Sequence, residues 1–535
     1  MKKALVLLTV ILLYNCSYGQ MGEWTWMNGN NFVNSLGHYG TQGVFNANNK
    51  PPGLYEPCEW TDKEGNFWLF GGVDTLGACS DLWEFKANIN QWAWIKGSGI
   101  VNQSGNYGNL TVASLANNPG GRCSNPSWVD TTGDLWMFGG FGYDINGNCH
   151  YLNDLWRYNI ATNEWTWMNG MNTVDDTGNY GAITIHATTN KPPARDETNA
   201  SWTDSNNNLW LFGGRSFLNN FSLSDLWKYD SFLQEWVWMK GANTANQLPV
   251  YGTQGIPDQA NDPGGRWCYS KWKDSSGNFW IFGAGATMVG SYNDVWRFNP
   301  ITLEWTWIKG PNFANDTGTI GTRCIGNLTL NPSGRSENRA CWARNCENFI
   351  CFGGSTPFGY TNDLWNYNVG NNEWVNVSIN QYGNYGTILV SSPTNFPPIR
   401  MGSIGWSDSL GNLWMFGGMN HNSQTFNDMW RFIPDTTCPY LCNITTGNHS
   451  PKSTPSQISL SPNPFTTTTT LTLQGTYHNA SLFIYNLLGQ ELKSIPVGTN
   501  TQLTINREHL PAGMYFYKVI DENKEVIGIG KMIVE

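Results

Sequence analysis

The chain carries little charge for its length, which limits the partners it can have. Lys, Arg, Asp and Glu make up 13% of its 535 residues, and 30 basic against 40 acidic side chains give a formal net charge of −10. A nucleic-acid-binding protein needs a basic surface that neutralises phosphates. This composition therefore argues against a nucleic-acid partner.

The usual signatures of metal sites and membrane spans are also missing. The seven His are scattered and no Cys-x-x-Cys occurs, whereas structural zinc sites show closely spaced Cys and His ligands. Beyond the N-terminus, no stretch approaches the roughly 20 apolar residues that cross a bilayer. We therefore expect no metal, no other cofactor, and no transmembrane segment in the mature chain.

The N-terminus has the three parts of a secretory signal peptide. Lys2 and Lys3 precede an apolar run over residues 4–14, and a short polar segment follows. This pattern predicts a signal peptide over residues 1–19, with Gln20 as the new N-terminus. Cys16 leaves a lipoprotein as an alternative, although the residues before it fit a lipobox poorly.

Eleven of the twelve Cys remain after that cleavage, and an exported protein folds in an oxidising environment that favours disulfides. Cys438 and Cys442 close a short loop and are the predicted pair. Cys341, Cys346 and Cys351 crowd one predicted hairpin and could supply a second bridge. Because eleven is odd, one thiol stays free or the pairing is incomplete.

The chain is rich in Gly, with 59 residues, and in aromatic residues, at 14%. Both favour strands and turns over long helices. All 29 Trp lie between residues 24 and 430. The chain therefore has at least two parts, and only the first is built with tryptophan.

Three motifs recur together along this first part. Apolar runs end in a double glycine, or one variant of it, whose first Gly lies at positions 71, 139, 213, 283, 353 and 417. An Asp-x-Trp segment follows each of them, with its Trp at positions 83, 156, 227, 296, 365 and 430. A Trp-x-Trp segment then ends the unit, starting at positions 92, 165, 236 and 305, with a weaker copy at 374.

Each unit holds four short alternating segments, the pattern of antiparallel strands joined by hairpins. Four such strands, repeated around an axis, form a β-propeller blade. The double glycine, the aromatic-rich strand and the terminal Trp resemble the kelch repeat, over roughly residues 21–434. We predict an all-β fold: a six-bladed kelch β-propeller over residues 20–436, followed by a small C-terminal β-sandwich.

The sixth unit lacks a Trp-x-Trp strand, whereas such a segment, residues 23–27, stands alone before the first unit. We expect this segment to complete the last blade and close the ring, because closure removes an exposed sheet edge. Of the 29 Trp, 28 fall at five recurring positions and are predicted to form the core. Only Trp267 lies outside the pattern.

Long loops connect the units, and an Arg stands where each innermost strand begins, except in the first unit, which has Leu54. In kelch propellers an Arg at this position often lines the central pocket. The resemblance therefore makes six residues candidate ligand-binding groups at the channel mouth, for a carboxylate, sulfate or phosphate: Arg122, Arg195, Arg266, Arg335, Arg400 and the neighbouring Trp267. The alternative is that each Arg holds an Asp or the carbonyl groups of neighbouring blades.

A Gly-x-Tyr-Gly that recurs in the loops is interpreted as a structural turn.

Catalysis has less support in the sequence, and no catalytic residue is predicted. Kelch enzymes that resemble galactose oxidase need copper ligands that this chain lacks at matching positions; a six-bladed sialic-acid mutarotase is a nearer precedent. The Asp-rich hairpins, such as residues 407–412, separate Asp and Gly too widely for a sialidase Asp-box. No nucleophile elbow, phosphate loop or paired carboxylate stands out.

The composition changes after the last repeat, and residues 437–457, rich in Thr, Ser and Pro, are a predicted linker. The final residues, 458–535, resemble the C-terminal sorting domain of type IX secretion substrates, although Ser461 stands where its opening motif usually has Tyr. This resemblance implies export by the type IX machinery across both membranes of a Gram-negative cell, followed by release or surface attachment. The candidate sorting residues are Pro462, Asn463, Pro464, Gly489, Gly513, Tyr515 and Lys531.

Together these features predict a secreted or surface-attached, non-enzymatic binding protein whose ligand is a glycan or another protein. One alternative is a carbohydrate-active enzyme, mutarotase-like or oxidase-like, that uses the Arg-lined face. Another is a structural surface component without a small ligand. Carboxylates exposed beside Arg at the channel mouth would favour an enzyme, and a large apolar patch on the long loops would favour a protein partner.

Overall fold

The chain forms two compact units, Met1–Ile444 and Thr445–Glu535. The computed structural model describes residues 22–198, 201–216, 221–287, 289–344, 348–435, 438, 458–473, 480–486, 491–498, 501–508, 510–520 and 526–535. Every regular element in these residues is a β-strand, and they contain no helix long and apolar enough to cross a membrane. The predicted signal peptide lies outside them, as does the predicted linker except for Cys438.

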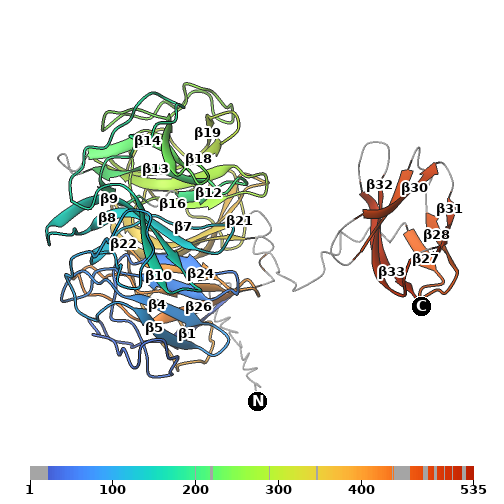
Figure 1. Cartoon of the computed structure of the whole chain (residues 1–535), viewed down its shortest axis with the longest axis horizontal. Helices are drawn as coiled ribbons and strands as arrows, with labels where there is room; N and C mark the ends of the chain where they lie inside the picture. Colours follow the sequence, from blue (N-terminus) through green and yellow to red (C-terminus); the bar gives the residue numbers. More distant parts are fainter. Residues whose placement is uncertain are drawn as a thin grey trace, which may run out of the picture. The chain divides into compact units, whose positions relative to one another are not determined.

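Six antiparallel sheets follow one another along the first unit (Figure 1). The first contains β2 (Cys58–Thr61), β3 (Phe67–Phe70), β4 (Leu82–Lys86) and β5 (Gln91–Lys96). The second contains β6 (Arg122–Cys123), β7 (Ser127–Val129), β8 (Leu135–Tyr143), β9 (Cys149–Asn159) and β10 (Glu164–Asn169). The third contains β11 (Arg195–Asp196), β12 (Ser201–Thr203), β13 (Leu209–Ser216), β14 (Phe221–Asp230) and β15 (Glu235–Lys240).

The remaining three sheets repeat the plan. The fourth contains β16 (Ser270–Lys273), β17 (Phe279–Ala286), β18 (Gly290–Asn299) and β19 (Glu304–Lys309). The fifth contains β20 (Cys341–Arg344), β21 (Asn348–Thr356), β22 (Gly359–Asn368) and β23 (Glu373–Ser378). The sixth contains β24 (Ile404–Ser407), β25 (Leu413–Phe416), β26 (Met429–Pro434) and, as its outer strand, β1 (Gly22–Asn28).

The ring closes through strands from opposite ends of this unit. β1 pairs antiparallel with β26, from Gly22 opposite Pro434 to Asn28 opposite Met429, and the two strands lie side by side in Figure 1. The inner strands contact one another in the order β2, β7, β12, β16, β20 and β24, and β24 contacts β2 again. The predicted six-bladed propeller is confirmed.

The core lies between neighbouring blades, where six apolar clusters each combine residues of two adjacent sheets. Inner-strand tryptophans also bond across these interfaces: Trp60 Nε1 donates to the Trp136 carbonyl at 2.9 Å. A buried Trp removes about 150–250 Å² from water, which contributes up to roughly 4–6 kcal/mol. The predicted core role holds for four of the five recurring Trp positions; the second Trp of each Trp-x-Trp is only half-buried.

The long loops are fixed by their tyrosines and cover the outer edge of the next sheet. In five loops the Tyr of Gly-x-Tyr-Gly, or of the looser copy at Tyr251, donates to the Asp of an Asp-x-Trp strand at 2.6–2.9 Å, which confirms the structural turn. The chain then runs along the outer strand; Thr111 N, for example, donates to the Trp167 carbonyl at 2.7 Å. These loops satisfy edge groups that would otherwise invite sheet extension.

The second unit is a small β-sandwich, as predicted. Its described strands form two sheets, in the orders β27-β28-β31 and β30-β29-β32-β33. The strands are β27 (Ile458–Ser461), β28 (Thr468–Leu473), β29 (Ala480–Tyr485), β30 (Glu491–Gly498), β31 (Gln502–Asn506), β32 (Gly513–Ile520) and β33 (Val526–Val534). Alternating residues such as Leu482, Ile484 and Val519 fill the core between them.

Candidate functional site

The five arginines predicted to bind ligand are buried inside their blades, each with at most 1% of its surface exposed. Both terminal nitrogens of each Arg donate to the carboxylate of the blade's own Asp-x-Trp motif, at 2.6–3.2 Å. The pairs are Arg122–Asp154, Arg195–Asp225, Arg266–Asp294, Arg335–Asp363 and Arg400–Asp428. These contacts contradict a ligand-binding role at the channel mouth and support the alternative, in which each Arg holds an Asp.

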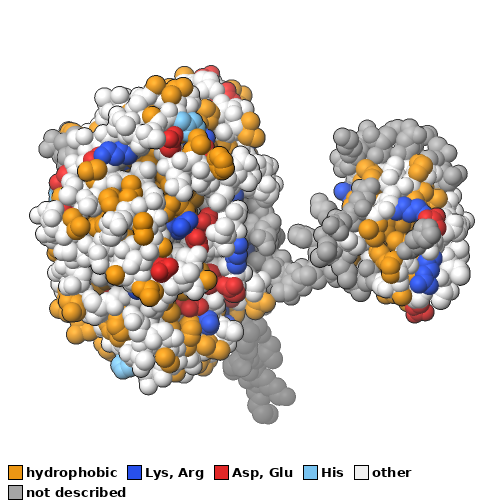
Figure 2. All heavy atoms as spheres, in the orientation of Figure 1, with side chains coloured by type: hydrophobic (Ala, Val, Ile, Leu, Met, Phe, Trp, Pro, Cys, Tyr) orange, Lys and Arg blue, Asp and Glu red, His pale blue; other side chains and the backbone are white. Residues whose placement is uncertain are grey.

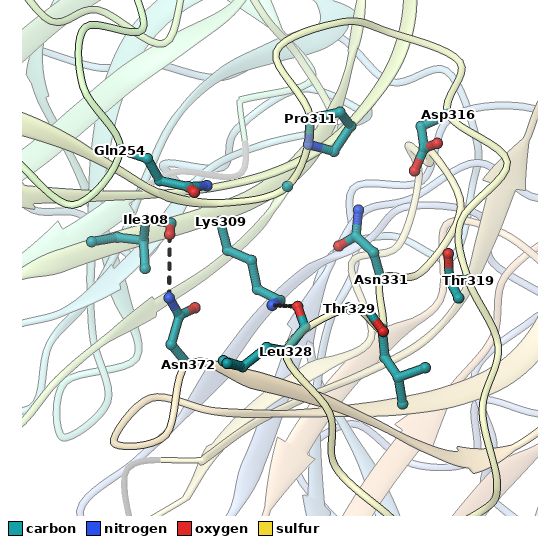
Figure 3. Close-up of a pocket in the computed structure, with 12 residues that line it drawn as sticks. Gln254, Ile308, Lys309, Pro311, Asp316, Thr319, Leu328, Thr329, Asn331 and Asn372 are labelled. Atoms are coloured by element: carbon teal, nitrogen blue, oxygen red, sulfur yellow. Dashed lines mark hydrogen bonds between the residues drawn. The ribbon is translucent and has the colours of Figure 1, made fainter.

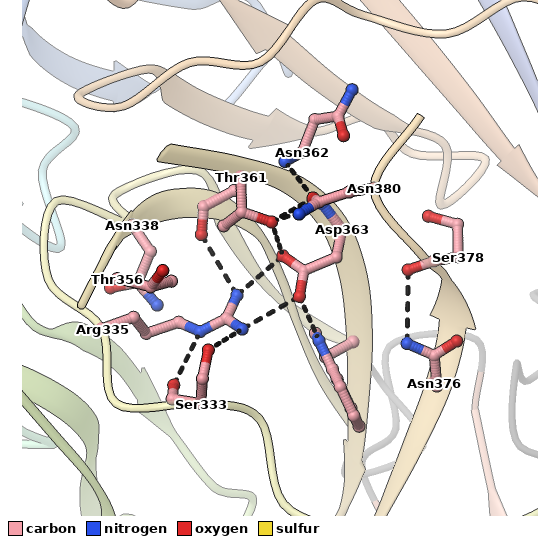
Figure 4. A network of polar contacts seen from close by, with 12 residues as sticks. Ser333, Arg335, Asn338, Thr356, Thr361, Asn362, Asp363, Asn376, Ser378 and Asn380 are labelled. Atoms are coloured by element: carbon pink, nitrogen blue, oxygen red, sulfur yellow. Dashed lines mark hydrogen bonds and ion pairs between the residues drawn. The ribbon is translucent and has the colours of Figure 1, made fainter. Parts of the chain in front are cut away.

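The fifth blade shows how complete this pairing is (Figure 4). Arg335 also donates to the Gly353 carbonyl at 3.2 Å, and Thr361 Oγ1 donates to Asp363 at 2.7 Å. Although burial opposes ionisation of Asp363, the Arg335 guanidinium lowers the pKa of this carboxyl below its ordinary value. The Arg335 guanidinium is therefore held by hydrogen bonds within its own blade.

The first blade lacks this pair because Leu54 replaces the Arg. Its Asp81 accepts hydrogen bonds from Tyr39 at 2.9 Å and from the Gly99 amide at 2.8 Å. Without a cation beside it, burial raises the pKa of Asp81, while the Gly99 and Tyr39 bonds oppose the shift.

A ring of six residues surrounds the propeller axis, each lying two positions after the Arg or its Leu54 equivalent. All six have positive φ, between 48° and 64°: Glu56, Ser124, Glu197, Cys268, Glu337 and Gly402. Backbone amides link neighbours around the ring, for example Gly402 N to the Glu337 carbonyl at 2.9 Å and Glu56 N to the Gly402 carbonyl at 3.1 Å. The sequence therefore presents six side-chain positions to the axis at one level.

The ring side chains bond to one another in the buried centre. Ser124 Oγ donates to Glu56, and Cys268 Sγ donates to Glu197. Tyr55 Oη, one position before the ring, donates to Glu337 at 3.0 Å. Burial raises the pKa of both Glu197 and Glu337, and the nearby Glu56 carboxyl raises them further. The centre thus favours protonated carboxyls.

Arg215, on β13, is one of the cations beside this ring. It pairs with Asp196 through two hydrogen bonds, at 2.9 and 3.1 Å, and reaches Glu197 at 3.2 Å. Burial raises the pKa of Asp196 to about 6, although Arg215 opposes that shift. Trp267, a predicted ligand contact, lies half-buried with its ring 5.7 Å from the Arg215 guanidinium. The Trp267 ring therefore lies beside Arg215, whereas the neighbouring Arg266 is buried against Asp294.

Four of the axial groups have atoms that could hold a cation. One ligand atom from each of Glu56, Glu197, Cys268 and Glu337 lies within 4.8 Å of the others. Arg215 lies 3.2 Å from Glu197, and Arg339 lies 3.7 Å from Glu56. These guanidiniums already supply positive charge to the cluster, so we assign no metal to it.

A further cavity lies in a groove between the fourth and fifth blades (Figure 3). It has a volume of about 490 Å³ and is lined mainly by polar side chains, including Gln254, Asp316, Thr319 and Asn331. Lys309 Nζ crosses the groove and donates to the Leu328 carbonyl at 2.6 Å. Asn331 is 8% exposed, and its Oδ1 has no hydrogen-bond partner among the described residues. The groove offers polar groups without a strong net charge.

Comparison with known proteins assigns both units. Residues 459–535 match the family described as the secretion system C-terminal sorting domain. The chain is also similar to Kelch domain-containing protein 3 of Bos taurus, with 25% identity over 257 residues, or 46% of this chain and 52% of that protein. The human protein matches at 25% over 256 residues. The chain is a kelch-repeat propeller with a type IX sorting domain. The match spans about half the length of these curated relatives.

The sorting domain determines where in or outside the cell the kelch propeller is located. Proteins that carry it are exported by type IX secretion, so this chain is secreted or attached to the cell surface and engages the type IX machinery. No type IX component is part of the structure, so which residues make that contact stays a prediction.

The candidate sorting residues lie at several places in this domain. Asn463, between Pro462 and Pro464, accepts a hydrogen bond from the Ile533 amide at 2.8 Å, which ties the opening motif to β33. Tyr515 is buried and donates to the Pro511 carbonyl at 2.8 Å. Gly513 begins β32, and Lys531 pairs with Phe516 in the sheet. Gly489 lies outside the described residues.

The predicted Cys438–Cys442 disulfide is wrong, because Cys438 bonds to Cys324 across 114 residues of sequence. Cys324 lies in the long loop of the fifth blade, so the bridge ties that loop to the segment after β26. Sequence spacing favoured the local pair; only the folded ring brings these two sulfurs together. Cys341 and Cys351 are free thiols, and Cys346 and Cys442 lie outside the described residues.

Sequence reasoning missed the axial kelch residues. Arg215 follows a double glycine, and Glu56, Glu197 and Glu337 share one offset from the start of their inner strands. That common offset was a usable signal, since equivalent positions of a propeller converge on its axis. The repeated Arg is the more conspicuous pattern, because the residue two positions after it varies among Glu, Ser, Cys and Gly.

Proposed function

We propose that this exported kelch propeller is a non-enzymatic glycan-binding protein that takes sugars in the grooves between its blades. The single observation that carries the proposal is the groove of Figure 3, with a volume of about 490 Å³ and a mainly polar lining in which Lys309 and Asp316 carry opposite charges. Sugar hydroxyls both donate and accept hydrogen bonds, so they suit side chains such as Gln254, Thr319 and Asn331. The apolar faces of Leu328 and Pro311 suit the C–H face of a sugar ring.

Asn331 gives the groove its strongest argument for a ligand. A buried acceptor without a partner costs about 1–3 kcal/mol, and Asn331 Oδ1 is such an acceptor. A sugar hydroxyl in the groove would donate to it and remove that cost. Lys309 is held by the Leu328 carbonyl, so it stiffens the groove wall.

A second groove repeats this arrangement between the first and second blades, with a volume of about 340 Å³. Lys96 donates to the Leu115 carbonyl at 2.6 Å, as Lys309 does to Leu328. The segment Gly-Thr-Gln-Gly supplies Gln42 to this groove and Gln254 to the other. Two weak sites on one rigid ring would give a branched or repeated glycan higher avidity.

A protein partner has less support from the surface. Each of the six long loops exposes a β-branched residue at an equivalent position, 49–57% accessible: Val44, Val112, Ile185, Ile256, Ile325 and Val390. These six side chains are distributed around the ring. On the face shown in Figure 2, apolar side chains are likewise spread among uncharged polar ones. Isolated apolar residues of this kind are ordinary on a protein surface.

The enzyme alternative has one observation in its favour, the carboxyls of Asp196 and Glu197 beside Arg215. Both carboxyls are buried, with 1% and 5% exposure, and Arg215 donates a hydrogen bond to each of them. The kelch relatives and the sorting domain also suggest a non-enzymatic protein. We therefore place binding first, and any sugar that binds can be assayed for turnover.

The test is a glycan array, including acidic sugars, probed with the purified full chain. We expect a hit whose affinity falls at least tenfold in Gln42→Ala/Gln254→Ala, because both side chains are exposed and line the grooves. Gln381→Ala is the matched control, since this loop Gln bonds to Asn362 through its backbone amide and carbonyl. A blank array, or equal loss in the control, would refute glycan binding and favour a protein partner or a structural role.

A further inference from the structure

A separate, smaller cavity lies on the propeller axis, beyond the ring of six residues. It has a volume of about 130 Å³ and is lined by inner-strand residues one to four positions after the ring, from five of the six blades. The charged groups in its lining are Glu59, Lys271 and Arg339. Neither the five buried arginines nor the grooves between blades take part in it.

Arg339 is the central group of this axial cavity. It is 5% exposed, and its Nη2 donates to the Asn125 carbonyl at 3.1 Å. Its Nε and Nη1 make no hydrogen bond within the described part of the chain. The nearest carboxylate oxygens lie 3.5 Å away on Glu59 and 3.7 Å away on Glu56, beyond normal hydrogen-bond distance. Two guanidinium nitrogens, Nε and Nη1, are therefore buried without a hydrogen bond, and the two carboxyls contact Arg339 only as longer ion pairs.

The lining also contains a second cation, Lys271. Lys271 and Arg339 face two acidic groups, Glu59 in the lining and Glu56 in the ring. The Cys341 thiol adds no charge near neutral pH, since burial raises its pKa to about 11. Lys271 has three N–H donors, one of which goes to Ser201 Oγ. A bound anion would accept hydrogen bonds from both Arg339 and Lys271.

We propose that this axial cavity binds a small carboxylate or oxyanion between Arg339 and Lys271. A cavity of this volume has room for about four water molecules at about 30 Å³ each, which suits an anion of four or five heavy atoms. The carboxylate or oxyanion accepts from an unpaired guanidinium N–H of Arg339 and from the Lys271 ammonium. This site does not depend on glycan binding in the grooves.

Calorimetric titration of the full chain with acetate and with inorganic phosphate, at constant ionic strength, tests the proposal. We expect one-to-one binding of at least one probe, and the preferred probe tells a carboxylate site from an oxyanion site. Lys271→Met should weaken that binding at least tenfold. Lys273→Met is the matched control, since Lys273 lies two positions further on β16, is exposed, and donates to the Thr203 carbonyl; it should bind as the native chain does.

A variant that is expected to strengthen anion binding controls for misfolding. Glu59→Gln removes the negative charge from the lining, so it should strengthen anion binding several-fold, a gain that a damaged fold would not give. Absence of binding for both probes in the native chain would overturn the proposal. So would equal affinities of Lys271→Met and Lys273→Met, or weaker binding by a folded Glu59→Gln variant.

Discussion

At the scale of single residues, the polar interior of the propeller is organised by the five Arg–Asp pairs. Arg195 and Asp225 are both fully buried and joined by two hydrogen bonds of 2.7 Å. Arg195→Leu leaves the Asp225 charge buried without its partner, and we expect it to lower the free energy of unfolding by about 3–5 kcal/mol. Urea denaturation of the full chain measures this loss.

The first blade suggests a control for the Arg195→Leu prediction. Because Leu54 occupies the Arg position there, Arg195→Leu/Asp225→Asn should regain at least half of the lost stability. If the double variant were no more stable than Arg195→Leu, the cost would come from packing and not from the unpaired charge.

Asp262 allows a prediction on pH. Burial raises the pKa of its carboxyl from 3.8 to about 6, against the Gly264 amide, which lowers it. The folded state therefore holds a proton that the unfolded state releases between about pH 4 and pH 6, so stability falls as pH rises through this window. Asp262→Asn removes this fall and should stabilise the chain at pH 7 by about 1–2 kcal/mol.

Unfolding at pH 4 and pH 7 measures the Asp262 effect. The loops of the second and fifth blades already carry Asn118 and Asn331 before the equivalent Pro, so Asn fits the site. The advantage of the variant should nearly vanish at pH 4. An advantage of the same size at both pH values would assign it to hydrogen bonding instead of protonation.

At the scale of elements, the outer strand of the sixth blade decides whether the ring is closed. β1 buries Trp24 and Met27 and supplies the full ladder to β26. Deleting residues 22–28 exposes the inner face of β26 and a sheet edge. We expect the propeller to lose at least about 5 kcal/mol, from two large buried side chains and the ladder, seen as a steep fall in melting temperature.

Deletion of seven residues from the predicted linker, residues 450–456, is the control for the β1 deletion and should leave melting unchanged. Unchanged cooperative unfolding without β1 would refute its closing role.

At the scale of the whole molecule, the two units have separate tasks: the sandwich directs export, and the propeller carries the proposed glycan-binding grooves. Removing residues 458–535 should therefore trap the propeller in the periplasm, as cell fractionation and surface labelling would show. The chain lacking residues 450–456 should still be exported. Surface display of the truncated chain at the normal level would contradict the sorting role.

Much of this architecture could be read from periodic residues. The double glycines, the Asp-x-Trp strands and the recurring tryptophans repeat in the same order at steps of 64–74 residues. A repeat that cannot bury its own face must stack on its neighbours. The same periodicity misled the site prediction. A repeated Arg is conspicuous in sequence, but its partner Asp, some 30 residues away, takes both of its terminal nitrogens in the fold.

The sequence by itself determined the blade plan, the displaced closing strand and the type IX address, because each depends on local pattern or on motif order. Only the tertiary structure decided which polar groups and thiols bond to one another within the fold and which do not. Cys438 meets Cys324 instead of Cys442, five arginines are buried by their own blades, and Arg339 keeps two donors unpaired. Such outcomes depend on which residues meet across the ring, and contacts between distant parts of a chain are not encoded in local spacing.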